Sequence, residues 1–326
     1  MFERIGLSCA NAQAMKNIGL VGVGAMGEPM GASLMRAGFT LRICAHRSRE
    51  RIEHLVAAGA VELPDPAAVA SASEAVITMV PDSPQVEEAI FGERGVAAGM
   101  KSGGYVIDMS TISPVASRSF NERLRQRGIA MLDAPVSGGP ARAKTGELTI
   151  MVGAEPEAFR ACESVLRAMG TPTHAGPPGM GETFKLVNQI IIAVVMIADV
   201  EALVFAKKAG ANIDLLRNVI ATATGSNYLL DKWLPNTWFK ANHEGGFALD
   251  LLRKDLNAAL DAAKQMHVPM LEAALASQLY LQTSAEGYGK LDYSSVSELY
   301  ERAAGVRVID GALERSVAPE RSSGNP

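Results

Sequence analysis

Cysteine is scarce in this sequence: the 326 residues include only Cys9, Cys44 and Cys162, which lie far apart. An odd number of widely spaced cysteines argues against a disulfide framework and a zinc cluster, and it fits the reducing environment of the cytoplasm. The five histidines show neither HExxH nor HxxxH spacing, so we do not expect a metal site.

An excess of charge of one sign is also missing, because 31 lysines and arginines nearly balance 35 aspartates and glutamates. The net charge of −4 offers no electrostatic footprint for nucleic acid or for an anionic membrane. The apolar run at residues 190–198 is shorter than the roughly 20 residues that cross a bilayer, and it predicts a buried helix. Residues 1–15 lack the long apolar core of a signal peptide and are expected to form a disordered extension.

Short apolar runs alternate with amphipathic segments from residue 16 to about residue 180. Strands are predicted over residues 17–21, 40–44, 75–79, 105–108, 129–132 and 148–152. The helices predicted between them cover residues 26–37, 49–58, 114–127 and 157–169. Strands separated by helices of this length indicate βαβ units and a mostly parallel sheet, whose edge at the strand carboxyl ends binds ligands.

Long helical patterns replace this alternation after residue 181. They predict helices over residues 182–209, 213–221, 249–265, 269–282 and 294–302. We therefore expect an α/β protein with an N-terminal Rossmann-type doubly wound sheet over residues 16–180. An all-α C-terminal domain for substrate binding and dimerisation should follow over residues 181–305, with a tail at 306–326. The first long helix is apolar on most faces, which predicts a homodimer or homotetramer.

A glycine-rich loop joins the first predicted strand to the first predicted helix. Its residues are Gly22, Val23, Gly24, Ala25, Met26 and Gly27. In this G-x-G-x-x-G pattern, Gly22 permits a tight turn, Gly24 lets a pyrophosphate approach the backbone, and Gly27 lets the helix pack closely on the strand. The position of the loop predicts a dinucleotide site at the helix N-terminus, and a purely structural glycine turn is the alternative.

The end of the second predicted strand decides between the two nicotinamide cofactors. A carboxylate there favours NAD, whereas a cation favours the 2′-phosphate of NADP. The sequence has no acid at the expected place, and Arg47 and Ser48, with Arg51 as a further candidate, could bind a phosphate. We therefore predict a preference for NADP(H) over NAD(H); a solvated helix start is the alternative.

Two further segments suit a small substrate that carries a carboxylate. Ser137, Gly138 and Gly139 follow a predicted strand and offer a hydroxyl and unshielded backbone amides, although plain turns share this pattern. Lys185 begins the first long helix, and Asn188 follows one turn later on the same face. On its own, Lys185 is typical of a helix-end cation whose ammonium reaches water.

Five motifs occur in the order GLVGVGAMGEPMGASLMRAG, DMSTISP, DAPVSGGPARAKTGELTIMVG, FKLVNQIIIA and FALDLLRKDLNAALDAA. This order resembles that of the β-hydroxyacid dehydrogenases, a family that includes 3-hydroxyisobutyrate dehydrogenase and 2-hydroxy-3-oxopropionate reductase. The resemblance covers residues 16–305. It implies a Rossmann domain, an all-α domain, and reversible hydride transfer between NAD(P) and a short β-hydroxy acid or its semialdehyde.

The resemblance also implies roles for individual residues. Lys185 becomes the catalytic general acid/base, Asn188 its companion amide, and Ser137–Gly139 the loop for the substrate carboxylate. The implied cofactor contacts outside the glycine-rich loop are Val80, Pro81, Gln85, Thr111 and Lys254. The chemistry agrees, because aldehyde reduction needs a proton at oxygen, and a partly desolvated lysine can donate it and stabilise the developing alkoxide.

Other functions remain as alternatives. An imine reductase has a similar two-domain plan without this lysine–asparagine motif, and a non-catalytic dinucleotide-binding scaffold would be expected to lose the lysine. A 6-phosphogluconate dehydrogenase is disfavoured because its helical domain is longer. The aromatic side chains of the second half fit either a substrate pocket or the helical core; they are Tyr228, Trp233, Trp238 and Phe239.

Overall fold

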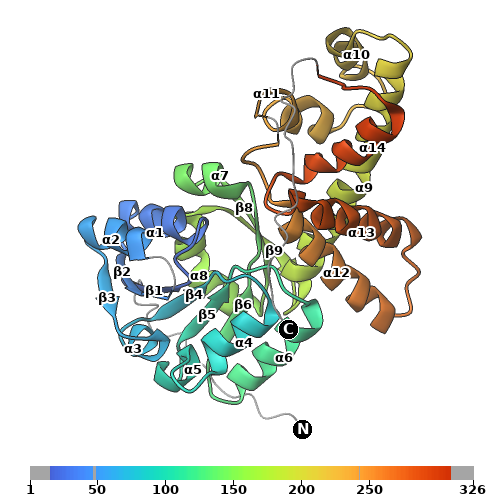
Figure 1. The fold of residues 1–326 in the computed structure, drawn as a ribbon. Helices are drawn as coiled ribbons and strands as arrows, with labels where there is room; N and C mark the ends of the chain where they lie inside the picture. The colour runs from blue at the N-terminus through green and yellow to red at the C-terminus, as the bar shows by residue number, and fades with distance from the viewer. Residues whose placement is uncertain (1–14, 47–48, 242, 310–326) are drawn as a thin grey trace, which may run out of the picture. The chain divides into compact units, whose positions relative to one another are not determined.

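The computed structural model describes residues 15–46, 49–241 and 243–309 (Figure 1). The chain divides between Lys185 and Leu186 into two compact units, an α/β unit and a helical unit. The predicted boundary at residue 180 falls at the start of a long helix that continues across this division. The predictions for residues 1–14, for Arg47 and Ser48, and for the tail beyond residue 309 lie outside the described residues.

One sheet forms the centre of the α/β unit, and the described residues supply nine strands to it. They are β1 (Asn17–Val21), β2 (Thr40–Cys44), β3 (Val61–Leu63), β4 (Ala75–Thr78), β5 (Tyr105–Asp108), β6 (Ala130–Asp133), β7 (Val136–Ser137), β8 (Leu148–Gly153) and β9 (Gly170–Gly176). The first six lie in the order β3-β2-β1-β4-β5-β6, and all their pairings are parallel. This is the strand order of the Rossmann fold, and the order reverses at β1 and β4, where such sheets bind ligands.

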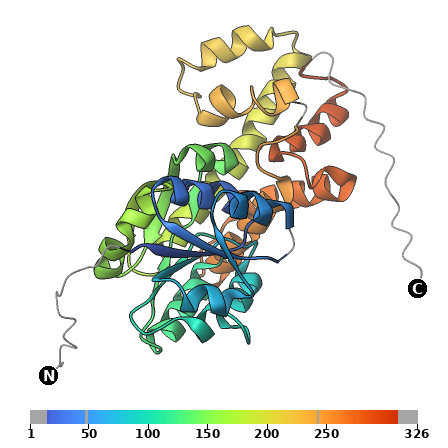
Figure 2. The same cartoon turned by 90° about the vertical axis from the view of Figure 1, so that its left-hand side faces the viewer.

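Helices cover both faces of this sheet (Figure 2). They are α1 (Gly27–Arg36), α2 (Arg49–Ala57), α3 (Pro66–Ser71), α4 (Ser83–Phe91), α5 (Val96–Gly99), α6 (Pro114–Arg125), α7 (Gly139–Thr145) and α8 (Pro156–Arg167). One hydrophobic cluster joins β1 to α1, α2 and α8, and a second joins β4 to α3, α4 and α6. The predicted doubly wound α/β architecture is confirmed.

Three strands were not predicted. β3 has three residues and β7 has two, which is too few for a clear alternation of apolar side chains. β9 has the sequence GTPTHAG, contains no fully buried residue, and pairs with β8 at the sheet edge, where a proline is tolerated. The sheet is mostly parallel as predicted, but β8 runs antiparallel to β6 and β7.

The helical unit begins within α9 (Met180–Lys208), a single helix of 29 residues. The helices that follow are α10 (Ile213–Ile220), α11 (Trp238–Ala241), α12 (Leu249–Gln265), α13 (Leu271–Thr283) and α14 (Ser297–Ala304). The helix predicted over residues 294–302 is instead a 3₁₀ turn (Tyr293–Val296) followed by α14. The turn begins where the Asp292 carboxylate accepts a hydrogen bond from the Ser294 N–H.

Within the described residues, α9 is long and apolar enough to cross a membrane by length and composition. The apolar run noted in the sequence, residues 190–198, is shorter and did not predict that the whole helix would meet this criterion. Ala193, Met196 and Val200 of α9 are fully buried in the core of the helical unit. Core helices of globular proteins meet the same criterion, because they are apolar on most faces.

The aromatic residues left open by the sequence mostly pack the helical unit. Trp238 is 3% exposed in its core, and Trp233 and Phe239 pack against the same cluster. The Trp233 indole N–H also donates to both Asp292 oxygens at 3.2 Å. Tyr228 differs, because it is 65% exposed.

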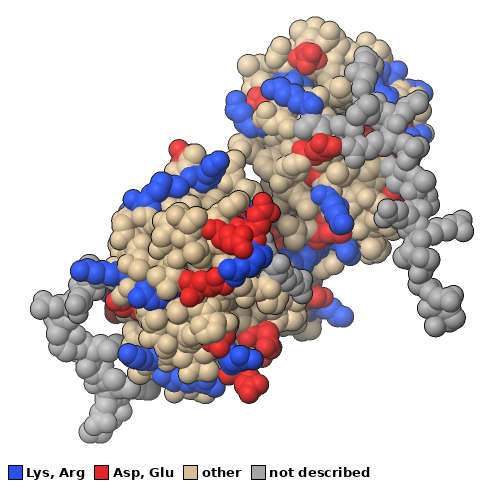
Figure 3. All heavy atoms as spheres, turned by 60° about the vertical axis from the view of Figure 1, so that its left-hand side comes forward, with Lys and Arg blue, Asp and Glu red and all other residues tan. Residues whose placement is uncertain are grey.

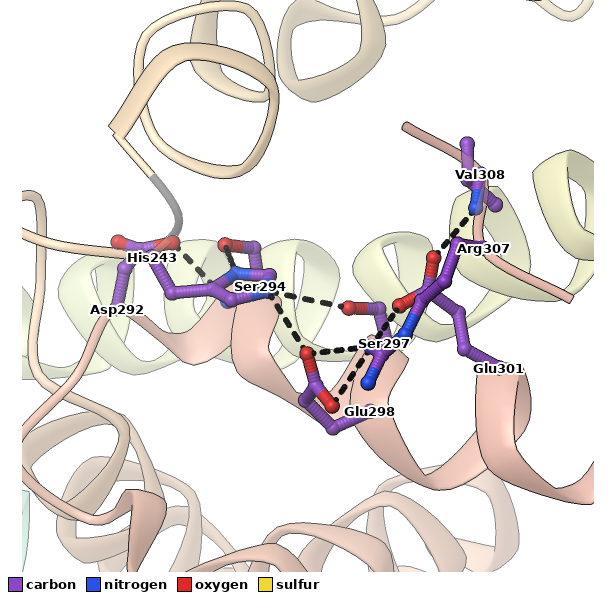
Figure 4. A network of polar contacts seen from close by, with 8 residues as sticks. All are labelled: His243, Asp292, Ser294, Ser297, Glu298, Glu301, Arg307 and Val308. Carbon is purple, nitrogen blue, oxygen red and sulfur yellow. Dashed lines mark hydrogen bonds and ion pairs between the residues drawn. The ribbon is translucent and has the colours of Figure 1, made fainter. Parts of the chain in front are cut away.

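A polar network ties residues 306–309 to α14 (Figure 4). The Arg307 guanidinium donates to Glu298 at 2.9 Å and to Glu301 at 2.8 Å, and the Val308 N–H donates to Glu301 at 2.6 Å. Val308 is 2% exposed. The packed helical unit therefore extends beyond the predicted boundary at residue 305.

Candidate active site

The glycine-rich loop lies directly after β1, at the point where the strand order reverses. Gly22 has φ +103°, and a Cβ added there would lie 2.2 Å from the Met79 carbonyl oxygen. A Cβ on Gly27 would lie 2.0 Å from the Gly22 carbonyl oxygen. Both residues must therefore be glycine for the fold itself.

Gly24 is different, because a Cβ added there would meet no protein atom within 4 Å. The packing of the unit does not explain this glycine. A ligand that approaches the backbone closely does, and the neighbouring N-terminus of α1 suits an anion. The loop therefore fits the pyrophosphate of a dinucleotide.

Charged side chains gather near the end of β2. Arg49 pairs with Glu53 and Glu62, whereas Arg51 and His54 both pair with Glu28 in the first turn of α1. The hydrogen bond from His54, together with the nearby Arg51, holds the pKa of Glu28 below its usual range. Arg51, a candidate for the 2′-phosphate, thus already has an acidic partner.

A buried carboxylate organises the ends of β4 and β5. Asp108 Oδ1 accepts hydrogen bonds from the Thr78 hydroxyl at 2.8 Å and from the Ser110 N–H at 3.2 Å. The Ser110 hydroxyl in turn accepts a hydrogen bond from the Val80 N–H at 3.0 Å. The network fixes the segment that starts at Val80 beside the one that contains Thr111.

The predicted cofactor contacts on these segments differ in exposure. Val80 and Thr111 are half-buried, whereas Pro81 and Gln85 are exposed. All four follow β4 or β5 at the ligand-binding edge of the sheet. Asp108, which fixes two of these segments, was not predicted, although a carboxylate that ends a buried strand is a signal that could have indicated it.

The predicted carboxylate loop connects β7 to α7. Ser137 ends β7, and Gly138 and Gly139 have φ values of +133° and +65°. Both values favour glycine, because a side chain would be strained there. All three residues are half-buried, so their polar groups are partly shielded from water.

Asp133 at the end of β6 holds the start of α9. Its two carboxylate oxygens accept hydrogen bonds from the N–H groups of Gly179 at 2.7 Å and Glu182 at 3.0 Å. Burial raises the pKa of Asp133 to about 7, although these backbone hydrogen bonds favour the ionised form. The sequence prediction missed this residue. It connects the strand before the carboxylate loop to the helix that carries Lys185.

Lys185 is 7% exposed, while its neighbours Phe184 and Val187 are 48% and 49% exposed. The residue is therefore largely buried, unlike the exposed helix-end cation that the residue type alone suggests. Asn188, three residues later on α9, is half-buried on the same helix face.

The amide of Asn188 belongs to a chain of hydrogen bonds in the helical unit. Asn188 Nδ2 donates to Gln189 Oε1 at 2.9 Å, and Gln189 Nε2 donates to Asp255 Oδ2 at 2.7 Å. The other oxygen of Asp255 pairs with Lys254 Nζ at 2.8 Å. Two predicted site residues, Asn188 and Lys254, are thus connected through Gln189 and Asp255.

Comparison with known proteins identifies the family of this chain. The family model for the NAD binding domain of 6-phosphogluconate dehydrogenase matches residues 17–184, and the model described as NAD-binding of NADP-dependent 3-hydroxyisobutyrate dehydrogenase matches residues 179–300. The chain is 35% identical to 2-(hydroxymethyl)glutarate dehydrogenase of Eubacterium barkeri over 90% of its own length and 98% of that protein. This chain belongs to the β-hydroxyacid dehydrogenase family. Its members include 2-hydroxy-3-oxopropionate reductase of Escherichia coli (strain K12), which is 36% identical over 88% of this chain and 98% of that protein.

A solved structure supports the assignment to the β-hydroxyacid dehydrogenases through the fold as well. The Mycobacterium tuberculosis 3-hydroxyisobutyrate dehydrogenase with L-serine has a TM-score of 0.82 and 30% identity, covering 88% of this chain and 99% of that one. Three imine reductases of solved structure are 17%, 18% and 21% identical to this chain, and that likeness shows the fold alone. The protein is an oxidoreductase that binds a pyridine nucleotide, as its motifs predict.

Proposed function

We propose that the enzyme interconverts a short β-hydroxy acid and its semialdehyde, of the 3-hydroxyisobutyrate or 2-hydroxy-3-oxopropionate type, with NADP(H). When bound, the nicotinamide supplies or takes up the hydride. Gly22–Gly27 would hold the pyrophosphate, and the segments at Val80–Pro81, Gln85 and Thr111 would line the rest of the cofactor site. The names of the relatives support this substrate class, since they act on short hydroxy acids or semialdehydes.

Lys185 is the proposed proton donor to the carbonyl oxygen during reduction, and the proton acceptor during oxidation. The burial of this lysine carries the proposal, because a partly desolvated cation interacts strongly with developing negative charge on oxygen. Asn188 would keep the reacting groups in line without competing for the proton. The Ser137 hydroxyl and the amides of Gly138 and Gly139 would bind the substrate carboxylate, and Lys254 would contact the cofactor and substrate.

Replacing Lys185 by alanine tests this role. We expect kcat to fall by about 10²- to 10⁴-fold, the usual contribution of a general acid, while NADPH still binds. Lys101→Ala removes an exposed lysine and is the matched control. The measurement is NADPH oxidation with glyoxylate and with succinic, methylmalonic and tartronic semialdehydes. Unchanged turnover in Lys185→Ala would contradict the assignment.

The preference for NADP(H) over NAD(H) rests on Arg47 and Ser48, with Arg51 beside them. The absence of an acid directly after β2 in the sequence supports it, and the pairing of Arg51 with Glu28 limits it. Comparing kcat/KM for NADPH and NADH is the test. An enzyme that uses NADH equally well or better has no such preference.

We also propose that the enzyme is a cytoplasmic homodimer or homotetramer. Exposed apolar side chains on α9 and α13 support association; they are Phe184, Val187, Ile191, Phe205, Leu271 and Leu275. Cys44 and Cys162 are buried free thiols, which suits a reducing compartment. Acidic and basic side chains are interspersed on the face in Figure 3, so we propose no nucleic-acid or membrane partner. Light scattering tests the association, and a monomer would contradict it.

A further inference from the structure

Gln189 is the residue of α9 that follows the proposed catalytic asparagine, and it is 1% exposed. Its carbonyl oxygen accepts a hydrogen bond from Asn188 Nδ2 at 2.9 Å. Its amide nitrogen donates to Asp255 Oδ2 at 2.7 Å. Both ends of this buried amide are therefore engaged, one with the proposed site and one with α12.

Asp255 is 2% exposed and also pairs through Oδ1 with Lys254 Nζ at 2.8 Å. A carboxylate in an ion pair has no hydrogen to donate, so it can only accept. Whatever faces the second oxygen of Asp255 must therefore be a donor. In this protein, that group is the side-chain amide of Gln189.

A side-chain amide has an accepting oxygen and a donating nitrogen of nearly the same shape, so its surroundings decide which way it points. Because Asp255 requires a donor, Gln189 must turn its nitrogen toward α12 and its oxygen toward Asn188. Asn188 must then offer its own nitrogen to Gln189. The oxygen of the asparagine amide consequently points away from Gln189, as an acceptor.

We propose that Gln189 is a positioning residue, which transmits the orientation set by the Lys254–Asp255 ion pair to the amide of Asn188. The acceptor oxygen presented in this way suits an N–H or O–H donor. The Lys185 ammonium, three residues earlier on the same helix, is such a donor. The inference rests on the proposed function for the roles of Lys185 and Asn188, but the chain of hydrogen bonds lies entirely within the helical unit.

Moving the carboxylate from position 255 to position 189 tests the proposal. In Gln189→Glu, two carboxylates face each other and no donor lies between them. In Asp255→Asn, position 255 can donate or accept, so the orientation of Gln189 is no longer imposed. In the double variant, the new amide at position 255 donates to the new carboxylate at position 189, whose second oxygen accepts from Asn188. The total charge of the double variant is that of the wild type.

We expect each single variant to lower kcat by about 10- to 100-fold, the range expected from one hydrogen bond to a charged group. The double variant should recover to within a few-fold of the wild-type kcat, with KM for NADPH little changed. Asp255→Asn and the double variant lose the same ion pair with Lys254. The difference between these two therefore does not come from the loss of that ion pair.

A double variant that is no faster than the slower single variant would overturn the proposal. Thermal unfolding of the same four proteins gives a readout that does not need turnover, since the melting temperature should fall in each single variant and recover in the double. Absence of that recovery contradicts the hydrogen-bond chain itself. If the wild-type enzyme turns over none of the semialdehydes, the proposed function fails instead, and the melting temperatures still decide whether the chain exists.

Discussion

The two units of this protein hold their ligand-facing groups by different means. In the α/β unit, the backbone itself forms the glycine-rich loop, because Gly22 and Gly27 allow close approaches that any side chain would block. In the helical unit, buried side chains hold one another, as Gln189 and Asp255 do. A backbone-built site leaves a glycine pattern in the sequence, whereas a side-chain network leaves none.

The largest test of this contrast lies within the glycine-rich loop. Gly27→Ala places a Cβ against the Gly22 carbonyl, and we expect a loss of about 3–5 kcal/mol in the free energy of unfolding, as for other severe steric conflicts. Gly24→Ala meets open space and should change stability by no more than about 0.5 kcal/mol, although it weakens NADPH binding. Denaturant unfolding and fluorescence titration measure the two effects. Equal losses of stability would remove the distinction between a fold glycine and a ligand glycine.

In the α/β unit, Asp133 differs from the glycines because its side chain holds the backbone, and its pKa makes stability depend on pH. The pKa rises from 3.8 in the unfolded chain to about 7 in the folded protein, so the folded state holds the extra proton between these values. The contribution of this carboxyl group to stability is therefore fully present below pH 3.8 and is lost as pH rises through 7, with a slope of up to about 1.4 kcal/mol per pH unit.

The variant Asp133→Asn isolates this contribution, because asparagine does not titrate. The wild type minus variant difference in unfolding free energy should be larger at pH 5 than at pH 8. Other buried carboxylates, such as Asp199, whose pKa burial raises to about 6, act equally in both proteins. A difference that does not change with pH would show that Asp133 stays ionised.

In the helical unit, Arg307 tests how much one side-chain network stabilises. Arg307→Met leaves Glu298 and Glu301 without their shared cation, and both carboxylates belong to buried residues. We expect a loss of about 1–2 kcal/mol, less than for a fully buried pair because the arginine side chain is 43% exposed. Arg302→Met removes the more exposed pair with Glu286, and its expected cost is about 0–1 kcal/mol in the same unfolding measurement. Equal costs would argue against a special role for the Arg307 network.

The smallest expected effect concerns cofactor choice in the α/β unit. Glu28→Gln removes the acid that engages Arg51 and His54, which leaves the Arg51 guanidinium available to a 2′-phosphate. We expect the ratio of NADPH to NADH affinity to rise by about 2- to 5-fold, the size of a surface charge contact. Glu53→Gln, which frees one partner of Arg49, is the control. A ratio that stays constant in Glu28→Gln would mean that Arg51 takes no part in the choice.

How far the site could be predicted differs between its parts. The glycine-rich loop and the Ser137–Gly139 loop are contiguous in sequence, so their chemistry is visible without a structure. Asp133 was overlooked because its partners are backbone amides 46 and 49 residues away. Gln189 was overlooked for the same reason, since Asp255 lies 66 residues further along the chain.

The sequence by itself indicated six of the strands, the helices between them and the turn after β1, and its resemblance to a known family implied the class of chemistry. The strands, helices and turn follow from apolar periodicity and glycine placement, which act over a few residues. Tertiary structure alone decided that Lys185 is buried, that Gly24 faces open space, and which amide meets which carboxylate. Burial and hydrogen-bond partners depend on segments that only packing brings together, and local patterns carry no record of those distant neighbours.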